Sequence, residues 1–338
     1  MDNVIYEQAR CFRIGFLLID GFALMSYSAA VEVLRAANLL AGRRLYDIQH
    51  IPGEGVRSVS SSGAIVEGTV RLDENTDFDL VLVVAGGDPE NFQDPKVFRW
   101  LRQVAHQNIR LGGVSGGPLI LASAGLMRGR RMTVHWEHVA ALSEMSPGLI
   151  VERSLYVIDR DRITCAGGSA PLDMMHAILT EQHGATFARR VSDWFMHTEV
   201  RPSGGPQRAG LVERYATSKP AVIAAIQMME SHMADPLSLT QLAALTGCGS
   251  RQLNRLFRNN LGQSTMSFYR YLRLEMAFKL LTQSTLTIME VALASGFSTA
   301  AHFARSFRSR YQKTPSSLRP PGIVPFQQYG LPEIEGNK

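Results

Sequence analysis

Residues 238–257 read SLTQLAALTGCGSRQLNRLF, and their spacing predicts two short helices joined by a sharp turn. Ser238 and Gln241 fit the capping box, in which a hydroxyl and an amide side chain satisfy free backbone amides at a helix start. Gly247 follows Ser238 by nine positions, where a residue of positive φ lets the first helix end. A second helix is expected from Ser250 to Asn259. This arrangement is typical of a helix-turn-helix unit.

The same spacing recurs 49 residues later, in the stretch 287–307, TIMEVALASGFSTAAHFARSF. Thr287 and Glu290 form a second capping box, and Gly296 again follows by nine positions. One such pattern is weak evidence, because any helical hairpin with a glycine turn can mimic it. The repeat predicts two helix-turn-helix units, the later one with its second helix at 299–308.

The second helix of each unit has an apolar and a polar face. Leu253, Leu256 and Phe257 lie at helical spacing in the first unit, as do Phe303 and Phe307 in the second. The opposite faces carry side chains that bind major-groove base edges and phosphates. The predicted DNA-binding residues are Arg251, Gln252, Asn254, Arg255, Thr299, His302 and Arg305. We therefore expect this region to bind double-stranded DNA at promoter half-sites.

A continuous helix is expected between the two units. Phe268, Leu272, Met276 and Leu280 recur every fourth residue, and this helix would hold the two units at a fixed separation. A spacing of about 34 Å places two recognition helices in successive major grooves on one face of DNA.

Basic residues gather in the same part of the chain. The net charge is +5, yet residues 213–321 hold 13 Lys and Arg against 5 Asp and Glu, whereas residues 1–212 hold 21 against 23. A basic, acid-poor region suits contact with phosphates, although basic surfaces can also be merely solvated.

The first half of the chain alternates apolar strand-like runs with amphipathic helical runs. Strands are expected at 12–19, 47–52, 80–85 and 110–114, with a hairpin at 155–165; helices are expected at 28–40, 95–107, 119–126 and 171–181. This alternation predicts an α/β domain in which helices sandwich a mainly parallel sheet.

The run RPSGGPQRAG at 201–210 is rich in Pro, Gly and Ser and has no periodicity. It predicts an interdomain linker at 201–217. The expected domains are then 10–200, for ligand sensing and dimerisation, and an all-helical DNA-binding domain at 218–321, followed by a tail at 322–338.

Composition excludes several classes of protein. The longest apolar runs are far shorter than the roughly 20 residues of a membrane span, and the N-terminus lacks the basic head of a signal peptide. Cys11, Cys165 and Cys248 are scattered without metal-site or disulfide spacing. We therefore expect a cytoplasmic protein with no membrane contact, no metal and no cofactor.

A glycine-rich turn, GGVSGG at 112–117, follows an apolar strand and precedes a helix. This is the layout of a nucleophile elbow, which exposes one side chain, here Ser115, beside free amides at a helix start. His135 lies 20 residues downstream, and Gly87 follows the preceding strand. The same turn could equally serve only to connect a strand and a helix tightly.

Residues 220–320 resemble the DNA-binding domain of the AraC/XylS family. The resemblance rests on 251–257, on Gly296-Phe297-Ser298 with His302-Phe303 and Arg305-Ser306-Phe307, and on Thr314-Pro315-Ser316 with Arg319. Three positions depart from the family pattern: Gly249 where a capping Ser is frequent, Thr265 where Pro is common, and Gln312 where Gly is usual. None of the three lies on the predicted base-reading face.

Residues 12–185 resemble the class I glutamine amidotransferase-like domain, in its PfpI-type, flavodoxin-like form, of GlxA-type regulators in the AraC family. The resemblance rests on the elbow, on Glu32-Val33 with Ala37-Asn38, on Ala85-Gly86-Gly87, on 124–126 and 133–136, and on Ala166-Gly167-Gly168 with Asp173. Enzymes of that superfamily carry Cys at the elbow position that Ser115 occupies here. A hydroxyl attacks carbonyls only when a positioned base removes its proton, and no acid in the sequence is placed to orient His135 for that task.

The resemblance implies a transcriptional activator of amine or amino-acid catabolism, acting as a homodimer with RNA polymerase and a small-molecule inducer. A zwitterion would place its carboxylate on the elbow amides and its cation on Trp136 and Glu32. The predicted ligand-binding residues are Glu32, Gly87, Ser115, Gly116, His135, Trp136 and Asp173. Alternatively, Glu32 pairs within its own helix, Trp136 is core and Asp173 is a helix N-terminal acid. Two rival functions are an enzyme that uses Ser115, and a ligand-independent regulator whose first domain only dimerises.

Overall fold

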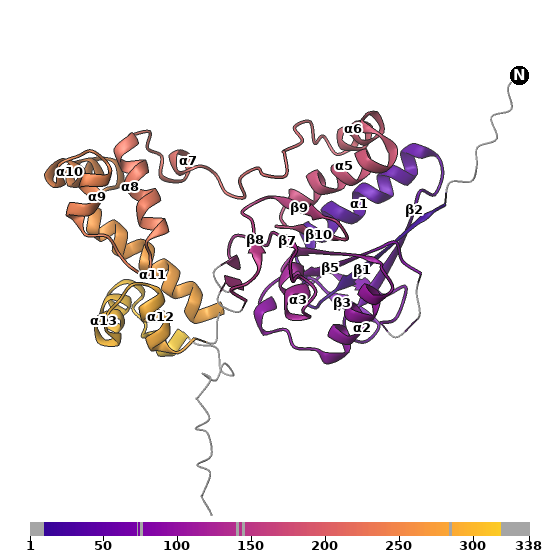
Figure 1. Ribbon diagram of the computed structural model, residues 1–338, viewed down its shortest axis with the longest axis horizontal. Coiled ribbons are helices and arrows are strands. Elements are labelled where there is room, and N and C mark those ends of the chain that lie inside the picture. The colour runs from indigo at the N-terminus through magenta and orange to yellow at the C-terminus, as the bar shows by residue number, and fades with distance from the viewer. Residues whose placement is uncertain are drawn as a thin grey trace, which may run out of the picture. The chain divides into compact units, whose positions relative to one another are not determined.

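The computed structural model describes residues 10–72, 74, 77–139, 142–143, 146–283 and 286–318. The chain divides into two compact units, Met1–Arg208 and Ala209–Lys338, which are described one at a time (Figure 1). The predicted tail at 322–338 and Arg319 lie outside the described residues.

The first unit is built on a six-stranded sheet with the order β2-β1-β5-β6-β10-β9. Its strands are β1 (Phe12–Leu18), β2 (Tyr46–Pro52), β5 (Leu80–Ala85), β6 (Arg110–Ser115), β9 (Tyr156–Asp159) and β10 (Arg162–Cys165). All neighbouring pairs are parallel except β9 and β10, which form the predicted antiparallel hairpin. All six residues of β5 are buried, as expected of a strand covered on both faces. The prediction of a mainly parallel sheet is confirmed.

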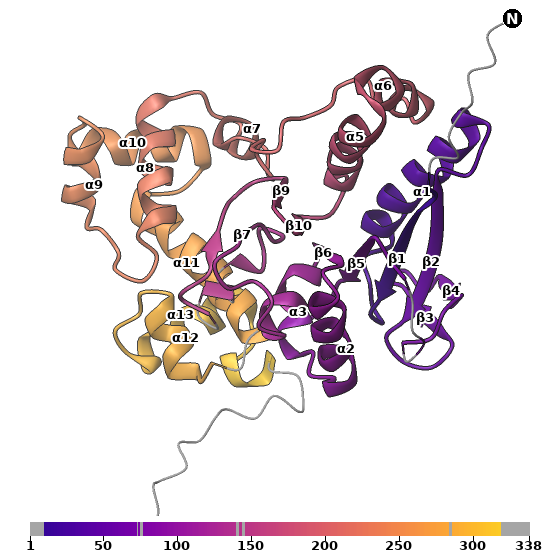
Figure 2. The ribbon, with the colours of Figure 1, turned by 45° about the vertical axis from the view of Figure 1, so that its right-hand side comes forward.

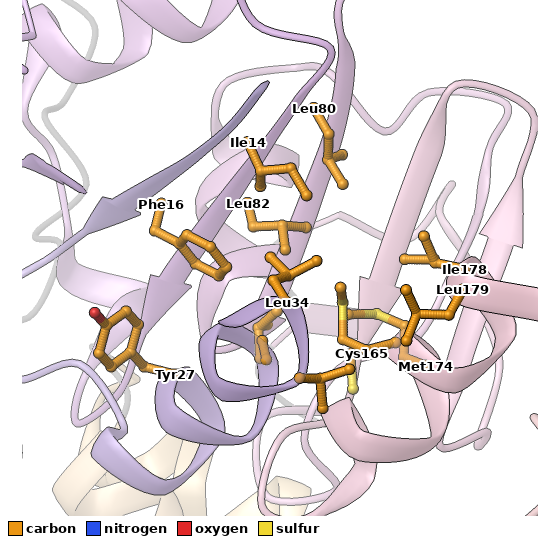
Figure 3. Packing of buried hydrophobic residues seen from close by; sticks show 14 of the residues in the cluster. Ile14, Phe16, Tyr27, Leu34, Leu80, Leu82, Cys165, Met174, Ile178 and Leu179 are labelled. Atoms are coloured by element: carbon orange, nitrogen blue, oxygen red, sulfur yellow. The ribbon is translucent and has the colours of Figure 1, made fainter. Parts of the chain in front are cut away.

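Helices cover both faces of this sheet. One face packs against α1 (Leu24–Ala41), α5 (Ala170–His183) and α6 (Ala185–Trp194), and the other against α2 (Pro95–His106) and α3 (Gly117–Ser123). Figure 3 shows the first of these layers, where Leu34 of α1 lies near Leu82 of β5 and Met174 of α5 lies near Cys165 of β10. The predicted sandwich of helices around the sheet is thus confirmed.

Cys165 lies within this layer and is fully buried (Figure 3). Burial raises the pKa of its thiol to about 12, so the group stays protonated and packs as a small apolar side chain. Cys11 and Cys248 are half-buried, and all three cysteines are free thiols.

Several elements of the first unit, most of them short, have no counterpart in the sequence-based prediction. They are β3 (Arg57–Val59), β4 (Ile65–Glu67), β7 (Arg131–Met132), β8 (Ile150–Val151), the 3-10 turn η1 (Pro89–Asn91) and helix α6. Strands of two or three residues are too short to show an alternation of apolar and polar positions.

The second unit consists of helices joined by loops, with no strand among its described residues, 209–283 and 286–318 (Figure 2). Its helices are α7 (Leu211–Tyr215), α8 (Pro220–Ser231), α9 (Leu239–Leu245), α10 (Ser250–Leu261), α11 (Thr265–Gln283), α12 (Ile288–Ala294), α13 (Ala300–Tyr311) and the 3-10 turn η2 (Pro315–Leu318). The predicted connecting helix is α11, a rod of about 28 Å. Phe268 and Leu272 of α11 join a core with α8 to α10, whereas Leu274 and Leu281 join a second core with α12 and α13. One helix therefore belongs to both helix-turn-helix units.

The segment 201–217 is more ordered than its composition suggests. The backbone amide of Leu155 donates to Ser203 at 2.7 Å, the side chain of Gln207 donates to the carbonyl of Val134 at 3.1 Å, and residues 211–215 form α7. Residues 201–208 thus pack on the first unit, because their polar groups find partners there.

No helix within the described part of the chain is long and apolar enough to cross a membrane.

Candidate functional site

Each helix-turn-helix unit begins with a complete capping box. In the first, Ser238 Oγ accepts the Gln241 amide at 3.3 Å, and Gln241 Oε1 accepts the Ser238 amide at 2.9 Å. In the second, the corresponding bonds between Thr287 and Glu290 measure 3.2 and 2.6 Å. The first helix of each unit therefore starts where the sequence predicts.

The two turn glycines adopt the left-handed conformation that their position predicts, with φ of 66° at Gly247 and 74° at Gly296. Their surroundings differ. A Cβ on Gly296 would lie 2.4 Å from the carbonyl oxygen of Met233, whereas nothing lies within 4 Å of one on Gly247. The second turn therefore also needs glycine for close packing.

The recognition helices α10 and α13 share one pattern of exposure. Leu253 and Phe257 are buried in α10, and Phe303 and Phe307 occupy the same places in α13. Six of the seven predicted DNA-binding side chains are exposed: Arg251, Gln252, Arg255, Thr299, His302 and Arg305. Buried apolar anchors thus fix each helix and leave a polar face exposed.

Asn254 has a different position. It is half-buried, and its Oδ1 accepts the backbone amide of Thr265 at the start of α11, at 3.0 Å. The side chain that the sequence predicts as a base reader therefore caps the connecting helix. Thr299 is likewise a cap, since its Oγ1 accepts the amide of His302 at 3.2 Å, but its exposed hydroxyl keeps a proton to donate.

Arg273 of α11 is a residue that sequence reasoning missed. Its Nε donates to the carbonyl of Ser295 at 2.8 Å, its Nη2 donates to the carbonyl of Gly296 at 2.5 Å, and its guanidinium lies 4.3 Å from the ring centroid of Phe297. Burial lowers the pKa of this guanidinium. Arg273 fixes the second turn on α11. Its position in the sequence does not distinguish it from a solvated basic side chain on a helix.

The elbow of the first unit has the predicted bend. Ser115 adopts φ of 60°, a left-handed conformation that is strained for a residue with a Cβ. Glycine is required around it, because a Cβ on Gly113 would lie 2.4 Å from the nitrogen of Pro118 and one on Gly117 would lie 2.0 Å from the carbonyl oxygen of Val83. The strand-to-helix connection is therefore as tight as a nucleophile elbow.

The groups of this elbow are nevertheless occupied or covered. Ser115 is only 8% exposed, and a Cβ on Gly167 would lie 2.8 Å from that of Ser115. No hydrogen bond among the described residues involves the Ser115 hydroxyl. The Gly116 amide donates to the carbonyl of Ala85 at 3.0 Å, so it is not available to a ligand carboxylate.

A pocket of about 190 Å³ lies beside the elbow, and we call it the Arg201 pocket. It is lined by His135, Trp136, Leu155, Ala166, Gly167, Gly168, Ser169, Ala170, Arg201 and Gln207, all in the first unit. Of the predicted ligand residues, His135 and Trp136 lie in its wall. The Nδ1 atom of His135 accepts the amide of Glu137 at 3.4 Å, and its ring lies 5.3 Å from the ring of Trp136.

Arg201 supplies the charge of this pocket, and sequence reasoning missed it within the Pro- and Gly-rich run. Its Nε and Nη2 donate to one carboxylate oxygen of Asp173, at 3.0 and 2.6 Å. The Nε2 atom of His197 lies 2.9 Å from the other oxygen, which also accepts the Arg201 amide at 2.8 Å. Asp173 is 0% exposed, so it positions Arg201 and does not line the pocket.

Glu32 and Gly87 are not part of the pocket lining. The carboxylate of Glu32 lies on α1 and pairs with Arg35 at 2.6 Å, which is the alternative the sequence analysis left open. Gly87 follows β5 with φ of 66° and serves the turn there. Two of the seven predicted ligand residues, His135 and Trp136, line the pocket. Asp173 orients Arg201, and the other four lie outside the pocket wall.

Comparisons with known proteins agree with both halves of this description. Residues 12–181 match the DJ-1/PfpI family, and residues 242–320 match a helix-turn-helix domain. The HTH-type transcriptional regulator GlxA of Rhizobium meliloti is 46% identical over 310 residues, covering 91% of this chain and 95% of that protein. The HTH-type transcriptional regulator CdhR of Pseudomonas aeruginosa is 38% identical over 312 residues, covering 92% of each chain.

Among solved structures, an AraC family transcriptional regulator from Pseudomonas putida is 26% identical with a TM-score of 0.49, covering 54% of this chain and 99% of that one.

GlxA and CdhR match nearly the full length of this chain, and the two family matches divide it into a DJ-1/PfpI domain followed by a helix-turn-helix domain. The chain therefore belongs to the family of HTH-type transcriptional regulators that includes GlxA and CdhR, in which a DJ-1/PfpI domain precedes an AraC-type helix-turn-helix domain.

Proposed function

We propose that the binding of this regulator to promoter DNA changes when a small metabolite with a carboxylate occupies the Arg201 pocket. One observation carries the proposal: a guanidinium lies in the pocket wall, held there by a fully buried carboxylate. A side chain fixed in this way loses less conformational entropy when an anion binds, and its Nη1, which makes no hydrogen bond among the described residues, can donate to that anion.

The rest of the pocket also favours an anion. Gly168, Ser169 and Ala170 lie at the start of α5, where the helix dipole places a partial positive charge, although the Gly168 amide donates to Ser26 Oγ at 2.8 Å and the Ala170 amide to the carbonyl of Gly167 at 3.1 Å. The negative charge of Asp173 is already compensated by Arg201, with His197 at hydrogen-bond distance. A carboxylate that binds Arg201 gains about 1.5–3 kcal/mol from a charge-assisted hydrogen bond.

The aromatic wall suits a second, cationic group on the same ligand. The ring of Trp136 is a favourable surface for an ammonium or quaternary ammonium group. We therefore propose an amino acid, a betaine or a related amine as the inducer. The carboxylate site is Arg201 in place of the elbow amides, and the proposed ligand contacts are His135, Trp136, Gly168, Arg201 and Gln207.

On the DNA side we propose that Arg251, Gln252, Arg255, Thr299, His302 and Arg305 contact two successive major grooves. A regulator of this kind reads paired half-sites as a homodimer and acts as an activator through contact with RNA polymerase. The shared helix α11 supports simultaneous binding, because it fixes one recognition unit relative to the other.

An enzyme that uses Ser115 is the second candidate, favoured only by the strained φ of that residue. The closely placed Gly167 and the lack of a hydrogen bond to the hydroxyl among the described residues speak for a pocket that binds without reacting. An enzyme would show turnover that Ser115→Ala abolishes.

The test on DNA is to incubate the purified protein with sheared genomic DNA of its source organism and to sequence the retained fragments. Enrichment of a few sites upstream of catabolic operons is expected. Retention without preferred sites would contradict sequence-specific regulation.

The test on the pocket is calorimetry with amino acids, betaines and polyamines, comparing the natural protein with Arg201→Gln. A ligand that binds the natural protein and is lost in Arg201→Gln is expected. If none of these compounds binds, the proposed ligand class is wrong, and a first unit that only dimerises becomes the better proposal.

A further inference from the structure

The chain leaves the first unit through the wall of the Arg201 pocket. Gln207 and Arg208 are the last two residues of that unit, and the second unit begins at Ala209. Gln207 lines the pocket, and its Nε2 lies 3.0 Å from Thr133 Oγ1, 3.1 Å from the carbonyl of Val134 and 2.7 Å from that of Ser154. The start of the connection to the DNA-binding unit is thus fastened at the ligand site.

Arg208 makes the second fastening. Its guanidinium carbon lies 4.1 Å from the ring centroid of Trp136, well within the range of a cation-π contact. Trp136 is itself a wall of the pocket. A cation belonging to the protein therefore already interacts with the ring on which a ligand cation would stack.

The fastening at Gln207 is incomplete. Its Oε1 is buried and finds no hydrogen-bond partner among the described residues. A buried acceptor without a partner carries a desolvation cost that offsets part of the gain from the bonds at Nε2. The contact between Arg208 and Trp136 consequently matters for whether the chain stays fastened.

We infer that the Trp136 ring is the cation subsite of the pocket and that Arg208 is its internal occupant, which a bound zwitterion expels. This inference rests on the proposed function of the Arg201 pocket. Two cations on one ring repel each other and share one quadrupole, whether they lie on the same face or on opposite faces. Binding of a ligand cation therefore weakens the Arg208 contact and frees residues 207–210, immediately before α7 and the DNA-binding helices.

The experiment uses the full chain and two probes that differ only in charge. Glycine betaine carries a carboxylate and a quaternary ammonium group, and 3,3-dimethylbutyrate has the same shape with carbon in place of nitrogen. Binding of each is measured by calorimetry to the natural protein and to Arg208→Gln. Hydrogen exchange of the backbone amides at 207–212 is followed by mass spectrometry in the same samples.

Removing the internal cation should tighten glycine betaine by about two- to fivefold, the change expected from one exposed cation-π contact, and should leave 3,3-dimethylbutyrate unchanged. Exchange at 207–212 should rise in Arg208→Gln, in Trp136→Leu and in the natural protein with glycine betaine bound. The double variant Arg208→Gln/Trp136→Leu should exchange no faster than either single variant, because each single change already removes the contact between Arg208 and Trp136. Arg190→Gln is the matched control, since Arg190 is also exposed and lies over an aromatic ring, that of Phe187.

Two failures are distinguishable. If glycine betaine binds in a manner that needs Arg201, but neither its affinity nor the exchange at 207–212 responds to Arg208→Gln, the ligand pocket stands and the role of Arg208 is wrong. If neither probe binds the natural protein or Arg208→Gln, the cation subsite is overturned together with the pocket's proposed ligand class.

Discussion

The side-chain oxygen of Asn254 in α10 accepts the backbone amide of Thr265 in α11, at 3.0 Å. Thr265 is fully buried, so water cannot satisfy this amide. The resembled family commonly carries proline at the position of Thr265, and proline has no amide to satisfy. Asn254 and Thr265 therefore form a functional pair within the fold, in which one residue meets a requirement that the other creates.

Asn254→Ala is predicted to lower the free energy of unfolding of the second unit by about 1–3 kcal/mol, because a buried amide loses its partner. Adding Thr265→Pro should restore most of the loss, since proline is favoured at the first position of a helix. All three tryptophans, Trp100, Trp136 and Trp194, lie in the first unit, so hydrogen exchange at α11 is the suitable measurement. A double variant no more stable than Asn254→Ala would contradict this pairing.

The two turn glycines should respond differently to the same change. Gly247→Ala places a Cβ in open space at φ of 66°, so only backbone strain of about 1–2 kcal/mol is expected. Gly296→Ala adds a clash with the Met233 carbonyl, and its destabilisation should be larger. Hydrogen exchange of the backbone amides in α10 and α13, measured at increasing temperature, reports the destabilisation caused by each variant. Equal effects at the two sites would show that the α8–α9 connection yields to the added methyl group.

The sequence predicts the helix-turn-helix units well because their limits are set locally. Capping boxes and positive-φ glycines act over a few residues, and both units begin and turn where those residues place them. The central strands are equally legible, since strands such as β5, covered on both faces, are continuous apolar runs.

The pocket could be predicted only in part, because its geometry depends on contacts between distant segments. Arg201 and Asp173 are 28 positions apart and meet only in the folded chain. The composition of 201–210 indicates a linker, yet hydrogen bonds to the first unit override that local preference. Asn254 was assigned to the DNA-reading face because its hydrogen bond with the Thr265 amide forms only when α10 and α11 pack together.

Arg255 and Arg305 occupy equivalent exposed places in the two recognition helices. Replacing either with alanine should weaken binding to a specific site by about 1–3 kcal/mol if the side chain makes a bidentate contact to guanine, and should relax specificity at one base pair. Fluorescence anisotropy with the enriched genomic site and its single-base variants measures both effects. Arg99→Ala, an exposed change in α2, controls for lost charge. Equal weakening on all sequences would mark a phosphate contact.

Mild acid should destabilise the first unit through His50. Burial lowers the pKa of His50 and raises that of Tyr27 to about 12, so burial favours the neutral imidazole, whose Nε2 lies 2.8 Å from the Tyr27 hydroxyl. Because the folded pKa lies below the unfolded value, this stabilisation is present above about pH 6.5 and is lost as the pH falls through the folded pKa.

The unfolding temperature of the first unit, followed by tryptophan fluorescence, should therefore fall between pH 7 and pH 5. His50→Gln keeps an acceptor for Tyr27 without a titrating group, and its decline should be smaller. His106→Gln, at the exposed end of α2, should decline as the natural protein does. Identical profiles for His50→Gln and the natural protein would place the acid sensitivity elsewhere.

Asp173 tests whether position or charge controls the Arg201 pocket. Asp173→Asn removes a negative charge near the proposed carboxylate site, which by charge alone would tighten binding of an anion. It also releases the Arg201 side chain from both of its bonds to Oδ2 and leaves this half-buried cation without its counter-ion. Because Arg201 already compensates Asp173, loss of orientation should dominate: glycine betaine should bind more weakly in calorimetry.

The same variant should lose about 1–3 kcal/mol of unfolding free energy, because the hydrogen bonds from Arg201 lose their charged acceptor. Arg201→Lys separates the effect of charge on ligand binding from the effect of side-chain orientation, since lysine keeps the positive charge and lacks the planar guanidinium. If Asp173→Asn folds and binds glycine betaine more tightly than the natural protein, repulsion outweighs orientation, and Asp173 restrains the ligand affinity of the pocket instead of preparing it.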